Sequence, residues 1–351
     1  MNGSKGRGKV LKNLLTRAAR SNEFGIFVAL IVLFTAVAIR NPSILKPYSL
    51  NLWIFSFSLF GIIAIGETLV VLTGGIDLSP GSLIALMGVL FALLVQMLGG
   101  GNGTDAIKGL GWSPWLAISA GVVIILCFGL LVGLFHAFYI NKLAVPPFII
   151  TLGTLIVARG VAEMITHGPN ISALPAAFGF IGASGNGPIP YLKVMPVAGI
   201  IFLSLAIAFT VLTQRTALGR QIYAVGGNFE GSRLSGVRVN YVRGWCYAIS
   251  GLLSALAGVI YASNVVSGDP KSGYGFELTA IAALVIGGTS LSGGVGTILG
   301  SVIGAMIMGL IPLGLTFSGI ESWWQSILTG IVVVIAVTLD SLRRMKRQRT
   351  R

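Results

Sequence analysis

The sequence predicts an all-α membrane protein that crosses the bilayer about ten times. Of its 351 residues, 54% are hydrophobic and only 10% are charged, which excludes a soluble globule of this length. In hydrocarbon the backbone must be paired within helices or a closed barrel, and the apolar runs lack the two-residue alternation of barrel strands. Ten runs of spanning length are found, at 24–40, 52–73, 80–98, 114–140, 147–166, 196–213, 244–264, 276–291, 294–317 and 323–340. The runs at 24–40 and 276–291 are the shortest, so nine and eleven helices are the alternative counts.

Basic residues are concentrated in segments that ten helices would place on one side of the membrane. Eighteen of the 24 Lys and Arg lie in residues 1–23, at Lys142, in the loop 214–243 and in residues 341–351. Loops rich in Lys and Arg stay in the cytoplasm, so both termini and this loop are predicted to be cytoplasmic. We therefore divide the chain into a basic tail (1–23), a transmembrane domain (24–340) and a second basic tail (341–351). Basic helix ends beside anionic lipid explain the net charge of +14 more simply than nucleic acid does.

No metal, disulfide or nucleotide site is expected. Cys127 and Cys246 fall within apolar runs and are expected to be packing residues, while His136 and His167 have no ligand-type neighbours in sequence. Residues 3–9 fit the pattern GxxxxGK, but Val10 stands where a phosphate-binding loop needs Ser or Thr, and no strand precedes it. No cofactor is therefore expected on this chain.

A polar break with the sequence TGGIDLSPG interrupts the apolar pattern at residues 73–81. In one interpretation it is a tight cytoplasmic turn in which Asp77 or Ser79 caps the next helix, with Pro80 in the first turn. In the other, the break lines a polar pathway. A related string occurs at 287–294, and the shared pattern GGxxLSxG indicates an internal duplication.

Acidic residues inside spanning segments usually face protein or a water-filled cavity. Glu67, Glu163 and Glu277 are such residues, and each is a candidate for a transport path. Together with the two breaks, the candidate translocation path consists of Glu67, Gly74, Gly75, Asp77, Ser79, Gly81, Glu277, Gly287 and Gly288. An ion-driven carrier using Glu67, Asp77 and Glu277 is one alternative function.

Small residues at four-residue spacing predict close helix packing. Gly296, Gly300 and Gly304 would stack along one face of a helix, and Gly129 and Gly133 form a second pair. These glycines are assigned to packing rather than to substrate.

The loop 214–243 is a long polar interruption in an otherwise apolar chain. Its centre, AVGGNFEGSRLSG, combines glycine breaks, a potential helix cap at Asn228 and a short segment suited to one helix. A cytoplasmic element of this kind predicts a docking site for another protein.

The chain resembles the membrane permeases of ATP-binding cassette importers for monosaccharides, of the ribose, xylose and arabinose type. The resemblance covers most of the chain and rests on NPSIL and SLNLW within 41–53, GETLVVLTGGIDLSPGSLIAL at 66–86, TLGTLIVARG at 151–160, AVGGNFEGSRLSGVRV at 224–239, SGLLSALAGVIYAS at 250–263 and ELTAIAALVIGGTSLSGGVGT at 277–297. The segment EGSRLSG at 230–236 is similar to the E-A-A-x-x-x-G loop of such importers, with small residues replacing both alanines. The resemblance assigns contact with a cytoplasmic ATPase to Gly226, Gly227, Asn228, Glu230, Gly231, Ser232, Arg233 and Gly236.

The resemblance also implies a mechanism and partners. A periplasmic or lipid-anchored binding protein would deliver sugar to the outer loops 99–113 and 167–195, and MgATP on the ATPase would drive alternating access. The permease would perform no covalent chemistry, and a second, identical copy would complete the pathway in the bacterial cytoplasmic membrane. Autoinducer-2, a polyol or a nucleoside is the alternative solute for the same architecture.

Overall fold

The computed structural model describes residues 22–101, 108–182 and 194–349, in which the only β-type pairing is an isolated bridge between Ile171 and Gly268. All other regular structure in these residues is helical, which confirms the all-α class. In chain order the helices are α2 (Asn22–Arg40), η1 (Pro42–Leu45), α3 (Pro47–Leu72), α4 (Pro80–Gly99), α5 (Pro114–Lys142), α6 (Pro147–Thr166), η2 (Ala176–Phe180), α7 (Val197–Arg215), α8 (Ala217–Gly227), α9 (Phe229–Leu234), α10 (Val239–Val265), α11 (Phe276–Ile286), α12 (Ile298–Phe317) and α13 (Ser322–Arg349).

Each of the ten predicted apolar runs contains a helix, but not every one is long enough to span. Eight helices of the described residues are long and apolar enough to cross a membrane. Helix α11 is not among these eight. Its 11 residues extend about 16 Å, roughly half the thickness of the hydrocarbon layer. At the C-terminus, α13 continues without interruption from the tenth run to Arg349, so the predicted boundary at residue 340 is not a break in the helix.

Two predicted runs were too long because hydropathy does not detect glycine-rich breaks. The helix predicted at 276–291 ends at Ile286, and the helix predicted at 294–317 begins only at Ile298. Between them Gly288, Gly293, Gly294 and Gly296 all have positive φ, which a continuing helix cannot contain. Gly296 therefore lies in this loop, before the N-cap Thr297, and the prediction that it stacks with Gly300 and Gly304 on one helix face is wrong.

The buried centre of the molecule is formed by α3 and α10, which contact each other and most of the other long helices. Helix α10 also packs closely on α5, where a methyl group at Gly133 would collide with the backbone of Tyr247 and Ala248. A methyl group at Gly129 would likewise meet Gly251 and Ala255. The pair Gly129 and Gly133 thus lies at a helix contact, as the spacing predicts. Of the two cysteines, Cys246 is buried in this centre, whereas Cys127 is exposed on the outer surface of α5.

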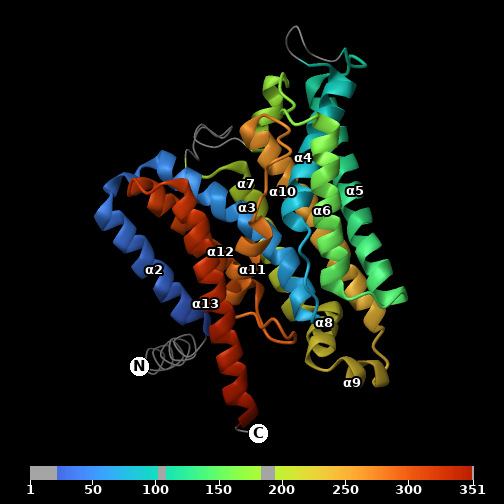
Figure 1. The fold of residues 1–351 in the computed structure, drawn as a ribbon, viewed down its shortest axis with the longest axis vertical. Coiled ribbons are helices and arrows are strands. Elements are labelled where there is room, and N and C mark those ends of the chain that lie inside the picture. The colour runs from blue at the N-terminus through green and yellow to red at the C-terminus, as the bar shows by residue number, and fades with distance from the viewer. Residues whose placement is uncertain (1–21, 102–107, 183–193, 350–351) are drawn as a thin grey trace, which may run out of the picture.

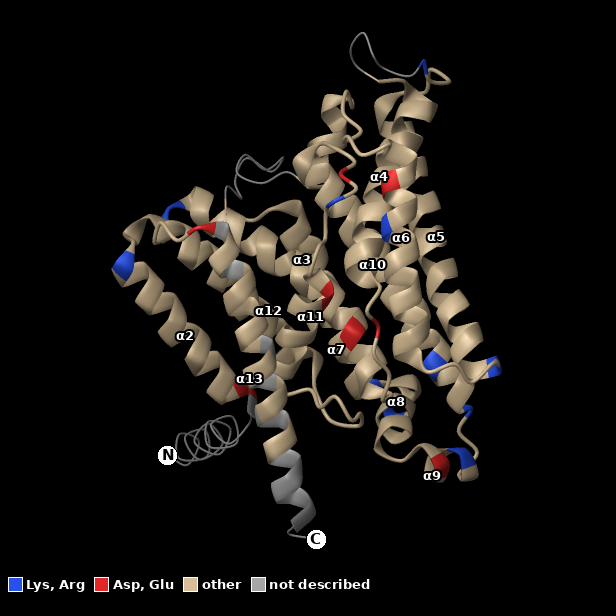
Figure 2. Ribbon diagram, in the orientation of Figure 1, with Lys and Arg blue, Asp and Glu red and all other residues tan. Residues whose placement is uncertain are grey.

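The start of α2, the end of α13 and the helices α8 and α9 lie on one side of the helical bundle (Figure 1). Figure 2 shows basic residues gathered around α8 and α9. The end of α4 and the start of α5 lie at the opposite side. This arrangement agrees with the sidedness predicted from charge, although residues 1–21 with their six basic side chains lie outside the described residues.

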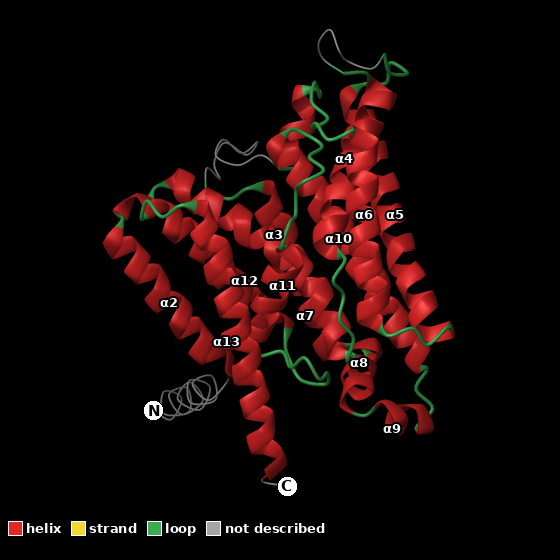
Figure 3. Ribbon diagram, in the orientation of Figure 1, coloured by secondary structure: helices red, strands yellow, loops and turns green. Residues whose placement is uncertain are grey.

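Several loops run lengthwise between the helices instead of staying at either end (Figure 3). One is the segment 73–79, which connects the end of α3 to the start of α4 in an extended conformation. In this segment Gly75, Asp77 and Ser79 are buried, and the intervening Ile76 and Leu78 pack toward α11. Non-helical backbone at membrane depth is tolerated where protein surrounds it. The segment is thus neither a helix nor a tight turn.

Candidate functional site

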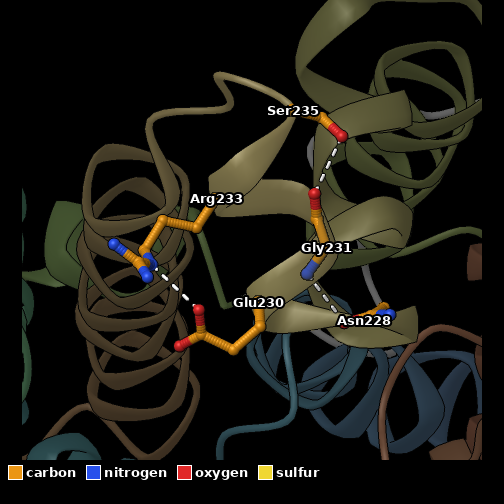
Figure 4. Close-up of polar contacts among 5 residues, drawn as sticks. All are labelled: Asn228, Glu230, Gly231, Arg233 and Ser235. Carbon is orange, nitrogen blue, oxygen red and sulfur yellow. Dashed lines mark hydrogen bonds and ion pairs between the residues drawn. The ribbon is translucent and has the colours of Figure 1, made fainter.

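The loop predicted to dock another protein folds into two short helices joined end to end. Thr216 begins α8, and its hydroxyl oxygen accepts a hydrogen bond from the Gly219 amide at 3.1 Å. Asn228 ends α8 and begins α9, where its side-chain oxygen accepts from the Gly231 amide at 2.8 Å (Figure 4). The predicted cap is therefore present, and it sets the corner between the two helices.

The second helix, α9, is stabilised by its own residues and closed by a glycine. Arg233 forms an ion pair with Glu230 at 2.9 Å, and the Ser235 hydroxyl donates to the Gly231 carbonyl at 2.8 Å (Figure 4). Gly236 follows with φ +84°, and the amides of Gly236 and Val237 donate back to the carbonyls of Arg233 and Ser232. This Schellman arrangement requires a residue that tolerates the left-handed conformation, which explains the glycine.

The outward surface of α9 is unusual for a cytoplasmic loop because it combines charge with a large apolar residue. The side chains of Glu230 and Arg233 are more than half exposed, and Leu234 is 79% exposed. On the inner side Ser232 is buried, and the guanidinium of Arg243 lies 5.8 Å from the centre of the Phe229 ring. The cation–π contact ties α9 to the first turns of α10.

The end of α8 contacts both glycine-rich breaks directly. A methyl group at Gly226 would collide with the Leu72 carbonyl and the Gly294 amide. These two groups are themselves joined, because the Gly294 amide donates to the Leu72 carbonyl at 2.9 Å. The Tyr223 hydroxyl donates to the Gly296 carbonyl at 2.8 Å. Burial raises the pKa of Tyr223 above its ordinary value, so the hydroxyl keeps its proton and remains a donor at neutral pH.

We call the meeting point of Leu72, Gly226 and Gly293–Gly294 the glycine junction. The two related strings at 74–81 and 287–294 approach each other here, since a methyl group at Gly293 would lie 2.9 Å from the Gly74 amide nitrogen. Gly74, Gly287 and Gly288, predicted to border a path, belong to the same two breaks. Gly287 lies against the backbone of Gly300, and Gly304 lies against Ala283, so both α12 glycines serve the contact between α11 and α12.

Asp77 is fully buried and its carboxylate is occupied by protein. One oxygen, Oδ1, accepts from the Ser79 amide at 3.0 Å and from the Ser79 hydroxyl at 2.6 Å. The other, Oδ2, accepts from the Ser250 hydroxyl of α10 at 2.9 Å. Ser79 is the N-cap residue of α4, as one interpretation expected, but its side chain makes no cap hydrogen bond. Asp77 instead fastens the extended segment to α10.

Glu67 lies near Asp77 but has no comparable support. It is fully buried in α3, and neither carboxylate oxygen has a hydrogen-bond partner within the described residues. Two further buried polar atoms in the same region, the Tyr247 hydroxyl and Nδ1 of His136, also have none in these residues. His136 is held from its other ring nitrogen by Thr154, at 2.8 Å. Glu67, Asp77, Tyr247 and His136 form a buried polar cluster of which the sequence had indicated only the two acids.

Glu277 lies where the first turns of α4 and α11 meet. A methyl group at Gly81 would collide with the Glu277 carboxylate and the Gly273 carbonyl, so only glycine fits at position 81. Glu277 is partly buried, whereas Glu163 of α6 is exposed. The predicted path residues therefore do not form one site: Gly74 lies beside the glycine junction, Glu67 and Asp77 lie in the buried polar cluster, and Gly81 and Glu277 lie where these helix ends meet.

Arg159 is a residue of α6 to which the sequence analysis assigned no role. Its Nη1 donates to the carbonyls of Pro270 and Ser272, both at 2.7 Å. These bonds attach α6 to the connection between α10 and α11 across more than 100 residues of sequence. The sequence does contain a signal for this contact, because an arginine inside a spanning segment needs specific partners for its charge.

Comparison with known proteins gives a consistent identification. Residues 49–337 match the family model described as branched-chain amino acid transport system / permease component. The chain is 40% identical over 318 residues to the ribose import permease protein RbsC of Bacillus subtilis, covering 91% of this chain and 92% of the relative. It is 36% identical to RbsC of Escherichia coli strain K12 over 90% of this chain and 93% of the relative.

A third relative, the galactose/methyl galactoside import permease protein MglC of Escherichia coli strain K12, is 34% identical over 93% of this chain and 96% of its own length. No solved structure matches. The family match spans most of the sequence and includes α4 to α12 with both polar breaks. The chain belongs to this family of transport-system permeases and is a multi-pass membrane permease subunit.

Proposed function

We propose that this chain is the permease subunit of an ATP-binding cassette importer that carries a monosaccharide, a pentose such as ribose, across the bacterial inner membrane. The observation that carries the proposal is the 40% identity with a ribose import permease along 91% of the chain. The 34% identity with a galactose permease supports the wider class of simple sugars. Hydrolysis of MgATP takes place on a separate subunit.

In this proposal the ATPase binds the exposed surface of α9. Glu230, Arg233 and Leu234 project away from the membrane-embedded core, and they offer one charge pair and one apolar contact to a groove on the partner. A binding protein delivers the sugar to the opposite face, at the outer loops 99–113 and 167–195. Residues 102–107 and 183–193 of these loops lie outside the described residues.

The glycine junction supports a route from the ATPase to the membrane path. The end of α8 contacts the last residue of α3 and the loop after α11 with backbone against backbone. Because no flexible side chain lies between them, a displacement of α8 would move the starts of both breaks together. One chain presents one α9, and a pair of ATPases needs two docking helices, so two identical permease copies would form the transporter.

Uptake by purified components tests the function. The permease is reconstituted in proteoliposomes with the ATPase and binding protein encoded beside it, and uptake of radiolabelled ribose, xylose, arabinose and galactose is measured with ATP inside or outside. We expect uptake of one of these sugars only with ATP on the α9 side. Uptake of autoinducer-2, a polyol or a nucleoside with none of the sugars would contradict the substrate class. Uptake without ATPase would contradict the importer mechanism and favour an ion-driven carrier.

A further inference from the structure

A cavity of about 330 Å³ that is lined by four side chains with polar groups lies in the half of the molecule opposite α8 and α9. Arg159 and Glu163 of α6 line it on one side, and Lys271 and Tyr274 of the connection before α11 line it on the other. A cavity of this volume lies at the lower end of the range that small-molecule sites occupy.

Arg159 gives the cavity a fixed wall. Its two hydrogen bonds to the carbonyls of Pro270 and Ser272 hold the segment that carries Lys271 and Tyr274 against α6. Glu163 lies one helical turn beyond Arg159 on the same face of α6, yet within the described residues the two do not form an ion pair. The carboxylate of Glu163 is therefore available to a ligand.

The remaining lining groups are also available. Tyr274 is 88% exposed, and the side chains of Glu163, Lys271 and Tyr274 make no hydrogen bonds within the described residues. In water such exposure would be ordinary, but Arg159 lies about 10 Å from the outer end of α6, at a rise of 1.5 Å per residue. Ionisable side chains at membrane depth mark a substrate or ion pathway unless they are paired.

The chemistry of the lining selects an uncharged, polyhydroxylated molecule. A guanidinium and an ammonium supply donors, a carboxylate supplies acceptors, and the phenol of Tyr274 supplies one of each beside an apolar ring. A sugar hydroxyl both donates and accepts, so one molecule satisfies groups of both kinds. With two cationic groups and one carboxylate, the lining offers charges of both signs to the hydroxyl groups of one molecule.

We propose that this cavity, lined by Arg159, Glu163, Lys271 and Tyr274, is the outer station at which the permease receives the monosaccharide from its binding protein. The proposal rests on the proposed function. It assigns to Glu163, Lys271 and Tyr274 direct contact with the sugar, and to Arg159 the positioning of the other wall.

The test uses variants of the three contacting residues, because loss of Arg159 would also release the segment it holds. Each is paired with a control of the same type, exposed on the same side of the membrane but remote from the cavity. The pairs are Glu163→Gln with Glu321→Gln, Lys271→Gln with Lys46→Gln, and Tyr274→Ala with Tyr48→Ala. In proteoliposomes of the complete transporter, sugar uptake and the stimulation of ATP hydrolysis by the loaded binding protein are measured in parallel.

We expect each cavity variant to lower uptake about tenfold while stimulated hydrolysis stays at the wild-type level, and each control to change neither. Uptake equal to that of the controls would overturn the proposal. A parallel fall of uptake and hydrolysis would overturn it as well, because the residues would then serve docking of the binding protein. Failure of the wild type to import any monosaccharide refutes the function itself, whereas a functional wild type with unaffected variants refutes only the cavity.

Discussion

Asp77 shows how one buried carboxylate can organise non-helical backbone inside a membrane protein. Its two oxygens receive three hydrogen bonds, two from Ser79 and one from Ser250. The bonds from Ser79 shape the extended segment locally, and the bond from Ser250 attaches that segment to α10. Buried polar groups are tolerated when they are satisfied in this way, and each lost partner leaves an uncompensated acceptor.

We predict that Ser250→Ala lowers the free energy of unfolding by about 2 kcal/mol, the usual cost of leaving a buried acceptor without its partner. Thermal unfolding of the detergent-solubilised protein measures the effect. Ser204→Ala is the matched control, because the exposed Ser204 hydroxyl bonds only within its own helix, to Ile200. Equal melting temperatures for the two variants would show that the Asp77 contact contributes nothing to stability.

For single residues, the sequence points to the buried acidic side chains but not to the residues that surround them. Glu67, Asp77 and Glu277 stand out because a carboxylate is rare in an apolar run, and all three lie at breaks or at buried contacts. Ser250 and Tyr247 give no such signal, since a serine or tyrosine in a spanning segment is common. Ser250 lies 173 residues from Asp77 in the chain, and only the folded arrangement brings the two together.

Among the elements, the contact of α5 with α10 depends on the missing side chain of Gly133. We predict that Gly133→Ala destabilises the protein by about 1 to 3 kcal/mol, because its methyl group would overlap the Tyr247 carbonyl and the helices would have to separate. Gly153→Ala in α6 is the control, since nothing lies within 4 Å of a methyl group there. The melting temperatures of the two variants measure both effects. A loss of stability in the control alone would contradict the packing argument.

Helix α8 offers a sharper comparison within two neighbouring residues. A methyl group at Gly226 would collide with the Leu72 carbonyl, whereas one at Gly227 would meet nothing within 4 Å. If the glycine junction transmits the conformational change of the ATPase, Gly226→Ala should lower sugar uptake more than tenfold and Gly227→Ala should leave it nearly unchanged. The ATPase should still co-purify with both variants, because neither alters α9. Normal uptake by Gly226→Ala would remove the junction from the mechanism.

Helices could be located from hydropathy, but their ends at the breaks could not. The apolar runs at 276–291 and 294–317 look nearly continuous because glycine is close to neutral in hydropathy and strongly apolar residues lie on both sides, yet positive φ at four glycines separates α11 from α12. The segment 73–79 was open to two interpretations for a related reason. A string such as TGGIDLSPG is equally compatible with a turn and with an extended segment, and burial by α10 and α11 decides between them.

For the whole molecule, the distribution of charge predicts the sidedness and the docking surface together. We predict that Glu230→Lys or Gly236→Lys leaves the permease folded in the membrane while abolishing co-purification of the ATPase and sugar uptake. The ion pair that Glu230→Lys removes is exposed and contributes little to stability. Gly236→Lys additionally strains a residue at φ +84°, so Glu230→Lys is the cleaner variant.

Glu321→Lys serves as the control for this experiment because Glu321 is exposed at the opposite face, beside the start of α13. It places the same new charge on the side that the ATPase cannot reach. Retention of the ATPase by Glu230→Lys, or its loss from Glu321→Lys, would reject the assignment of α9.

The shortness of α11 has a consequence for how the protein is made. A segment of 11 apolar residues preceded by Asp269 and Lys271 is too short to enter the bilayer by itself. Helix α12 provides the protein surface on which α11 packs, because the α12 glycines lie against Ala283 and Gly287. Insertion of this part of the chain must therefore wait until α12 has been synthesised.

Truncation tests this order of assembly. In a chain lacking Cys127 and Cys246, Thr279→Cys places a thiol at a buried position of α11. We expect a membrane-impermeant thiol reagent to label it when the chain is truncated after Gly294, and to leave it unlabelled in the full-length chain. Equal protection in both would mean that α11 enters the membrane unaided. The element that gives the transporter its irregular interior would thus be the last part of the core to be inserted.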